Sequence, residues 1–193
     1  NGDVSVYKRA GRVEALQSAL PDSAGETRGV GHTRWSTHGP PTDENAHPHT
    51  DCPGEVAVVH NGIIENYDAL RGDLEAAGHS FTSETDTEVV PHLIEAERDS
   101  GAPPLDAVQA AADRLEGSFA IVVAMAGVDE LFAIRRDSPL VIGHGEDGTF
   151  LASDVTAFLE HTRTVTYLED GDVAVLGREG ASLYRDGEGI GVE

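Results

Sequence analysis

The 193-residue chain carries 35 acidic against 13 basic side chains, a formal net charge of -22 at pH 7, so neither nucleic acid nor a membrane is an expected partner. No stretch approaches the roughly 18 apolar residues that span a bilayer, and no secretory signal opens the chain, so we expect a cytoplasmic protein. The single cysteine, Cys52, excludes an internal disulfide, and the length suits one domain over residues 1–193.

The first half of the chain alternates short periodic segments with glycine, proline and aspartate turns, which predicts strands interspersed with helices. Residues 67–77 place apolar side chains at three- and four-residue spacing, so we expect an amphipathic helix that Gly78 closes as a C-cap. The other elements predicted before residue 66 are a strand over 4–9, a helix over 12–20, and buried strands over 29–35 and 56–60.

Two more helices are expected after residue 80. Thr85 and Glu88 have the spacing of a capping box, which predicts a helix start, and Pro91 should weaken or kink that helix near its beginning. Residues 103–115 predict a third helix, because its two leading prolines suit a first turn.

The second half of the chain is rich in short strand patterns separated by turn residues. So many strands joined by short turns predict largely antiparallel sheets, and helices on the outer faces would complete a layered α+β sandwich. The predicted strands cover 119–124, 131–135, 140–142, 150–152, 165–168 and 173–176.

Four polar clusters interrupt this apolar framework at predicted strand ends and at a predicted helix start. Polar groups placed in this way converge on a rigid scaffold, so the pattern predicts a small-molecule site without naming the ligand. The clusters are His-Thr-Arg-Trp-Ser-Thr-His-Gly at 32–39, Asn-Ala-His-Pro-His at 45–49, His-Asn-Gly-Ile-Ile-Glu-Asn at 60–66, and Ser-Glu-Thr-Asp-Thr-Glu at 83–88.

These four clusters, followed by Ser-Pro-Leu-Val-Ile-Gly at 138–143 and Leu-Ala-Ser-Asp at 151–154, occur in the same order in glucosamine-6-phosphate synthases. Over almost its whole length the chain resembles the glutaminase domain of that family, a class II (type 2) glutamine amidotransferase. Other glutaminase domains, such as those of amidophosphoribosyltransferase and asparagine synthetase, share the Asn-Gly element and little of the rest.

The resemblance implies an N-terminal nucleophile hydrolase fold, a four-layer αββα sandwich of two antiparallel sheets. It implies that a terminal cysteine thiol attacks the glutamine amide, with the chain's own α-amino group as base. No cofactor is implied. The implied partners are glutamine, sugar isomerase domains that hold fructose-6-phosphate and receive the ammonia, and a second copy in a homodimer.

The resemblance also assigns roles to four residues. Arg34 would pair with the α-carboxylate of glutamine, and Asp86 would receive the α-ammonium group. Asn61 and Gly62 would form the oxyanion hole of the tetrahedral intermediate. From the residues alone, a surface arginine, an aspartate helix cap and an Asn-Gly hairpin turn remain the alternatives.

Further substrate-binding positions follow from the same motifs. Thr37 and His38 would contact the substrate backbone, and Trp35 would lie where ammonia leaves, although a lone tryptophan is more often part of a core. His47 would support the site. His47 and His49 with Cys52 also permit a zinc interpretation, but a second thiol or histidine pair at the usual spacing is not evident, so no metal is expected.

One departure from the family concerns the start of the printed sequence. The chain opens with Asn1 where the family has its cysteine, first strand and first helix, and the sugar isomerase domains are also absent. We therefore expect an N-terminally truncated glutaminase domain that is inactive as given. The alternative is a non-catalytic module that only binds glutamine.

The acidity predicts adaptation to molar salt, because a short Debye length screens self-repulsion that would destabilise the fold in dilute buffer. An ordinary acidic protein is the alternative. In either case the acidic side chains are spread among apolar periodic segments, which argues against disorder.

Overall fold

The computed structural model describes residues 2–21, 27–35, 38–185 and 187–191. Its main feature is a seven-stranded sheet in which every neighbouring pair of strands is antiparallel. In spatial order the strands are β1 (His49–Thr50), β2 (Val56–Ile64), β3 (Gly117–Met125), β4 (Leu131–Arg136), β8 (Val173–Gly177), β9 (Gly180–Arg185) and β10 (Glu188–Ile190).

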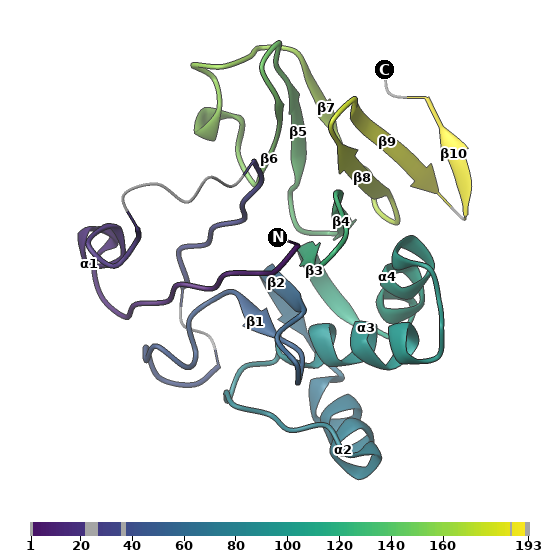
Figure 1. Ribbon diagram of the computed structural model, residues 1–193. Helices are drawn as coiled ribbons and strands as arrows, with labels where there is room; N and C mark the ends of the chain where they lie inside the picture. The colour runs from purple at the N-terminus through teal and green to yellow at the C-terminus, as the bar shows by residue number, and fades with distance from the viewer. Residues whose placement is uncertain (1, 22–26, 36–37, 186, 192–193) are drawn as a thin grey trace.

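A second, three-stranded antiparallel sheet places β5 (Val141–His144) between β6 (Thr149–Ala152) and β7 (Val165–Tyr167). Three helices of similar length follow β2 in the chain: α2 (Tyr67–Ala77), α3 (Val89–Asp99) and α4 (Pro104–Asp113). Figure 1 shows these helices in the lower part of the view and the second sheet, β5–β7, in the upper part. The remaining helical elements are short, α1 (Val13–Gln17) and the 3-10 turn η1 (Val155–Ala157).

The two faces of β3 bury different kinds of side chain. Phe119, Ile121 and Val123 belong to the core that α2, α3 and α4 complete, whereas Ala120 belongs to the core shared with the second sheet. This period-two division is what a strand buried on both faces requires. It makes β3 the centre of a layered α+β sandwich, and the predicted fold class of two antiparallel sheets is confirmed.

The core between the two sheets contains three buried alanines of the large sheet, Ala120, Ala133 and Ala174, beside larger aliphatic residues. Ala133 and Ala174 face each other across β4 and β8, and both are fully buried. They pack in one cluster with Ile142 of β5 and with Leu140, the residue before β5. The small alanine side chains let the second sheet approach the large sheet closely at these positions.

Several predicted elements differ from the structure at the N-terminal end. Residues 4–9 and 29–35 form no strand, because within the described part of the chain neither segment has a partner strand to complete a hydrogen-bonded ladder. The helix predicted over 12–20 shortens to α1 and buries no side chain. Alternating polarity predicted an extended backbone for residues 4–9. Whether an extended segment becomes a strand depends on a partner strand, which the local sequence pattern does not specify.

The start of α3 also differs from the prediction. The helix begins at Val89, and the Glu88 carboxylate accepts hydrogen bonds from Thr82 and Ser83 instead of forming a capping box with Thr85. Pro91 therefore falls in the first turn, where proline needs no helical partner. In contrast, α2 and its C-cap are confirmed, with Gly78 in the left-handed region at φ 105°.

No helix in the described part of the chain is long and apolar enough to cross a membrane.

Candidate functional site

A polar pocket lies where β2 emerges from the core. Five buried residues of β2 are followed by three exposed ones, Asn61 to Ile63, before Ile64 is buried again. The pocket has a volume of about 280 Å³. It is lined by His32, Thr33, Arg34, Trp35, His47, His60, Asn61, Gly62, Ile63, Thr85, Asp86 and Thr87, which come from all four polar clusters of the sequence.

Two lining residues of opposite charge give the pocket its polarity: Arg34 and Asp86. The Arg34 guanidinium is braced by its own loop, because it donates to the carbonyl oxygens of Pro40 at 3.1 Å, Gly39 at 3.2 Å and His38. A guanidinium has five N–H donors in a planar fork. The loop contacts therefore hold a positive charge at the wall of the pocket.

Asp86 is buried, with 4% of its surface exposed, and its Oδ2 accepts the backbone N–H of Ile64 at 2.9 Å. The helix-cap alternative for this aspartate is wrong, since α3 starts three residues later and its N-cap is Glu88. Beside it, the Thr87 hydroxyl is 2.8 Å from His60 Nδ1. Both contacts fasten the segment before α3 to the end of β2.

The Asn61-Gly62 pair lies inside β2, opposite Ala120 and Phe119 of β3, so the hairpin-turn alternative is wrong. His32 Nε2 is 2.8 Å from Asn61 Oδ1, so the ring donates to the amide oxygen. The Asn61 Nδ2–H groups are then the remaining donors of that side chain. The strand places these donors and the Gly62 backbone next to each other in the exposed part of β2.

Gly62 has the backbone conformation that glycine alone adopts easily, with φ at 120°. A Cβ atom at this position would lie 2.0 Å from the carbonyl oxygen of Ser118 on β3. Both the dihedral angle and the close approach of the neighbouring strand therefore require glycine. The requirement is local to the strand and does not by itself define a catalytic role.

Four histidines form a second layer around the pocket. The rings of His32 and His47 stack with centroids 4.1 Å apart, and His49 lies edge-on to His47 at 4.9 Å. Burial lowers the pKa of His60 to about 4, against the opposing influence of Asp86, and lowers the pKa of His49 to about 3. Burial also lowers the pKa of His47, and the neighbouring His32 acts in the same direction.

These rings are therefore neutral near pH 7, each with one donor and one acceptor nitrogen. His47 Nδ1 accepts the His60 backbone N–H at 3.3 Å, so His47 supports the strand that carries the Asn-Gly pair. His32 Nδ1 and His60 Nε2 are buried without a hydrogen-bond partner in the described structure. His32, His60 and Thr87 were not among the predicted site residues, although all three stand inside the polar clusters.

The remaining predicted positions are placed differently from one another. Trp35 lines the pocket with 89% of its surface exposed, so the core alternative for this tryptophan is wrong. His38 is not a lining residue, and its ring lies edge-on to Tyr67 with centroids 5.2 Å apart. Thr37 lies outside the described residues.

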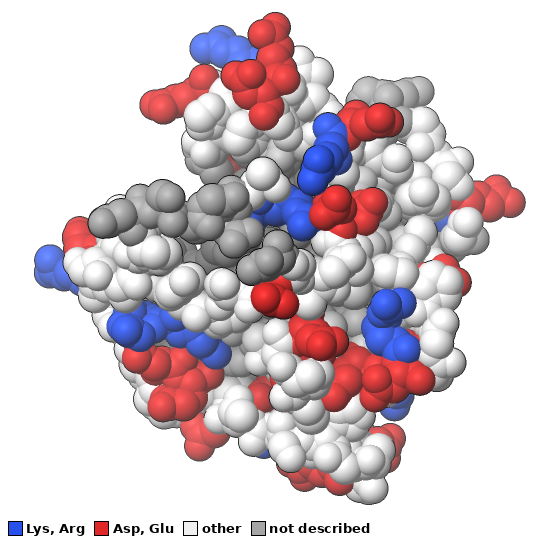
Figure 2. All heavy atoms as spheres, viewed as in Figure 1, with Lys and Arg blue, Asp and Glu red and all other residues white. Residues whose placement is uncertain are grey.

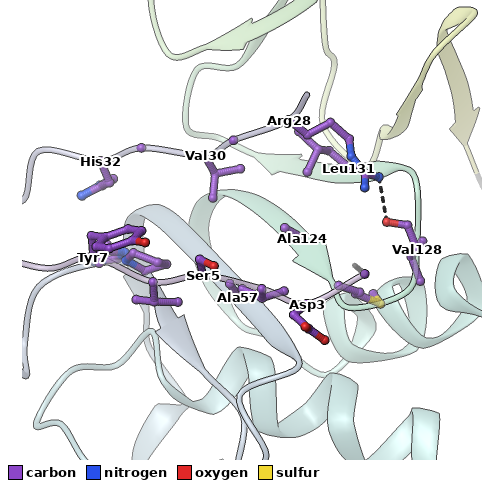
Figure 3. Close-up of a pocket in the computed structure, with 18 of the residues that line it drawn as sticks. Asp3, Ser5, Tyr7, Arg28, Val30, His32, Ala57, Ala124, Val128 and Leu131 are labelled. Atoms are coloured by element: carbon purple, nitrogen blue, oxygen red, sulfur yellow. Dashed lines mark hydrogen bonds between the residues drawn. The ribbon is translucent and has the colours of Figure 1, made fainter. Parts of the chain in front are cut away.

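A larger, mostly apolar cavity of about 360 Å³ adjoins the polar pocket, and His32 and His47 line both. Figure 3 shows the segment from Asp3 to Tyr7 and the segment from Arg28 to His32 along this cavity, with Ala124 of β3 between them in the view; Ala57 of β2 also lines the cavity. The Arg28 guanidinium donates to the carbonyl of Val128 at 2.7 Å and ties the second segment to the β3–β4 turn.

The zinc interpretation built on His47, His49 and Cys52 is not supported. Among the described residues, the group of potential metal ligands that includes Cys52 contains neither of these two histidines. His49 instead faces Thr85, with His49 Nε2 3.1 Å from the hydroxyl oxygen. His47 therefore lines the polar pocket, His49 lies behind it against Thr85, and the cysteine belongs elsewhere.

The layered sandwich of two antiparallel sheets, with a small polar pocket at the end of a central strand, is the architecture of N-terminal nucleophile amidotransferases. A family model described as a glutamine amidotransferase domain matches residues 32–160, which is more than half of the chain and includes all the described pocket residues. The chain belongs to this family.

Curated relatives confirm the resemblance drawn from the motifs. A protein named glutamine–fructose-6-phosphate aminotransferase [isomerizing] from Halobacterium salinarum is 57% identical over 186 residues, covering 96% of this chain and 30% of the relative. Proteins of the same name from Thermotoga maritima and Sulfurisphaera tokodaii are 50% and 46% identical, covering 93% and 98% of this chain. The chain thus spans about a third of the length of these relatives.

Solved structures extend the likeness to a second branch of the class. Glutamine phosphoribosylpyrophosphate amidotransferase from B. subtilis, complexed with ADP and GMP, aligns with a TM-score of 0.67 and 28% identity. The alignment covers 80% of this chain and 34% of that protein. A class-II glutamine aminotransferase domain protein from Silicibacter pomeroyi has the same fold, with a TM-score of 0.55 at 19% identity.

Proposed function

We propose that this chain is the glutaminase domain of a glucosamine-6-phosphate synthase, in which glutamine is hydrolysed to glutamate and the ammonia is transferred to fructose-6-phosphate. One observation carries the proposal. Residues from four distant segments, including Arg34, Asn61 and Asp86, line a single pocket. An amino acid has an anionic and a cationic end, and this pocket has one guanidinium and one carboxylate to match them.

In the proposed complex, Arg34 attracts the α-carboxylate of glutamine and Asp86 receives the α-ammonium group. Ligand pockets usually have volumes of about 300–1,000 Å³, so a cavity at the lower limit suits a single amino acid better than a peptide. Trp35, Thr37 and His38 would border the bound substrate, as the family motif assigns them. Exposed tryptophan next to a polar pocket is available to cover a ligand.

The chemical step that we propose uses Asn61 and Gly62 as donors. A cysteine thiolate adds to the amide carbon of glutamine, and the negative charge on the carbonyl oxygen is stabilised by Asn61 Nδ2–H and the Gly62 N–H. Ammonia leaves with the thiol proton, and water then hydrolyses the thioester to glutamate. Because His32 holds the Asn61 oxygen, the amide is fixed with its donors available before the substrate arrives.

The nucleophile in this proposal is the terminal cysteine of the family. The apolar cavity of Figure 3 supports its position, because it shares His32 and His47 with the polar pocket. A cysteine-bearing segment seated in this cavity would therefore end beside Asn61. The proposed partners are sugar isomerase domains, which fits a chain spanning about a third of its relatives, and a second copy in a homodimer. A cytoplasmic location is part of the same proposal.

Glutamate release from glutamine in molar potassium chloride tests the proposal. The 193-residue polypeptide should release none, whereas a polypeptide with the cysteine-bearing N-terminal segment of a family member joined ahead of Asn1 should be active. The matched control carries alanine in place of the added cysteine and should lose many orders of magnitude in rate. Saturable glutamine binding by calorimetry without hydrolysis in the extended polypeptide would instead support the non-catalytic module and overturn the glutaminase assignment.

A further inference from the structure

A compact group of four potential metal ligands lies apart from the polar pocket: Cys52, His79, His92 and Glu95. One donor atom from each lies within 4.8 Å of all the others. Cys52 stands in the turn between β1 and β2, His79 follows the C-cap of α2, and the other two are on α3 at a spacing of three residues. Three separate segments thus meet at one point.

The distances within this cysteine–histidine cluster suit a single ion. Cys52 Sγ is 3.6 Å from His92 Nδ1 and 3.8 Å from His79 Nδ1. Glu95 Oε2 is 3.0 Å and 2.8 Å from the same two nitrogens. A tetrahedral zinc ion with Zn–S of about 2.3 Å and Zn–N or Zn–O of about 2.0–2.1 Å separates its ligand atoms by about 3.3–3.6 Å. The four side chains are already close to that arrangement.

Hydrogen bonding alone leaves one buried nitrogen of the cluster unsatisfied. Each imidazole Nδ1 lies near both the sulfur and the carboxylate oxygen, so the two rings share the same two neighbouring atoms. If His92 Nδ1–H donates to Glu95, the lone pair on His92 Nε2 is left buried without a partner among the described residues, in a side chain that is 1% exposed. An unpartnered polar atom in such a position costs free energy.

A metal ion on His92 Nδ1 would change the buried Nε2 from a bare lone pair to an N–H group. The ring proton then resides on Nε2, and the nearest charged group there is the Glu88 carboxylate, 4.0 Å away. Metal-bound histidines commonly turn their other N–H toward a carboxylate, which fixes the ring. Phe81 also packs against His92, with ring centroids 4.4 Å apart. The buried Nε2 beside an acidic group therefore fits a ring that carries its proton on Nε2 and binds an ion through Nδ1, although at 4.0 Å the Glu88 oxygen makes no direct hydrogen bond to it.

We propose that Cys52, His79, His92 and Glu95 bind one zinc ion in a structural site. One thiolate and one carboxylate balance the two positive charges of the ion, and two neutral imidazoles complete four-coordination. On binding, the thiol loses its proton to solvent. Because the protein supplies all four ligands, no position remains for a substrate, so the ion would hold the β1–β2 turn, the end of α2 and α3 together. The site is independent of the proposed glutaminase chemistry.

Metal analysis and cobalt substitution test the site on the intact 193-residue chain in molar potassium chloride. Protein purified without a metal-binding tag or chelator should contain one zinc per chain. Replacement by Co²⁺ should give tetrahedral d–d bands together with a thiolate-to-cobalt charge-transfer band, which only the single cysteine can supply. Substoichiometric zinc with no cobalt spectrum would overturn the proposal. So would a stoichiometric cobalt complex without the charge-transfer band, because it would place the ion on other histidines.

Variants locate the ion. Cys52→Ser should abolish the charge-transfer band, and His79→Gln should weaken zinc binding by more than about 100-fold, beyond the usual effect of losing an outer partner. The controls are Glu97→Gln, two residues beyond Glu95 on α3, and His161→Gln in the second half of the chain. Both should keep full zinc content. Unchanged zinc affinity in His79→Gln, with folding verified by circular dichroism, would also contradict the proposal. If a variant fails to fold, the cobalt spectrum of the unmodified chain still tests the site.

Discussion

At the scale of single residues, the Asn61-Gly62 pair of β2 shows how one backbone position constrains the pocket. Gly62 sits in a strand, yet its positive φ excludes most side chains, and an added Cβ atom would lie 2.0 Å from the Ser118 carbonyl oxygen. The position therefore cannot be understood from the turn preferences of Asn-Gly sequences. It reflects the close approach of β3, which holds the Gly62 backbone at the wall of the pocket.

We predict that Gly62→Ala destabilises the fold, because the added methyl group collides with backbone and the residue keeps an unfavourable φ. Strained positions of this kind cost about 1–3 kcal/mol, and the collision adds to that cost. Gly72→Ala is the matched control: Gly72 lies within α2, nothing approaches its Cβ position, and alanine should stabilise the helix by about 0.5–1 kcal/mol. Urea unfolding at constant salt measures the free energy of unfolding of both variants. Equal changes in the two variants would contradict the proposed strain and collision at Gly62.

Asp86 allows charge to be separated from hydrogen bonding. In Asp86→Asn the amide oxygen still accepts the Ile64 N–H, but the negative charge at the pocket wall is lost. We therefore expect glutamine affinity to fall at least tenfold, about 1.4 kcal/mol or more, with a smaller change in stability. Calorimetry with glutamine is the measurement, and Asp106→Asn on α4 is the control. Unaltered affinity would show that Asp86 serves the fold and not the ligand.

At the scale of secondary-structure elements, the end of β2 is joined to its surroundings through buried neutral imidazoles. His47 accepts a backbone N–H of β2, and His60 contacts Thr87 ahead of α3. Lowered pKa values mean that protonation is unfavourable in the folded chain and ordinary in the unfolded chain. The junction should therefore weaken in acid.

We predict that stability declines as the pH falls from about 6.5, the unfolded pKa of histidine, toward the folded pKa of about 4 for His60 and about 3 for His49. In this window the unfolded chain binds more protons, and each group contributes on the order of 1.4 kcal/mol per pH unit at most. The free energy of unfolding, measured with urea at several pH values in this window, should fall less steeply with decreasing pH in His49→Gln than in the unmodified chain. In His161→Gln its pH dependence should be unchanged. A pH-independent stability would contradict the assignment of neutral rings.

At the scale of the whole molecule, the acidic surplus dominates the surface. Red acidic side chains outnumber blue basic ones on the face shown in Figure 2, and the net charge is -22. Several arginines are already paired at the surface, such as Arg28 with Asp129 at 3.2 Å and Arg178 with the same carboxylate at 3.5 Å. Exposed pairs of this kind contribute little, so self-repulsion among the remaining carboxylates should be the main electrostatic effect at low salt.

We predict that the melting temperature rises steeply between about 0.1 M and 1 M potassium chloride, since the Debye length shortens from about 10 Å to about 3 Å. A concentration series with guanidinium chloride and urea supplies the control. Low guanidinium chloride should first stabilise the protein because it is a salt, whereas urea should destabilise it throughout. Salt-independent melting would remove the inference of salt adaptation, even though one relative comes from Halobacterium salinarum.

The sequence by itself determined much of this protein. Periodicity located α2, α3 and α4 and most strands of both sheets, because burial of one helix face or of alternate strand residues is written in neighbouring positions. The ordered motifs were sufficient to indicate the glutaminase family and to nominate residues of the pocket, including Arg34, Asn61 and Asp86.

Tertiary structure alone decided which distant groups meet. Residues 4–9 alternate like a strand but have no partner strand among the described residues, and Cys52 joins His79, His92 and Glu95 instead of the nearer His47 and His49. Local patterns specify which residues are buried and in what conformation. They do not specify contacts between segments 27 to 43 residues apart, which depend on how the whole sandwich closes around its two cores.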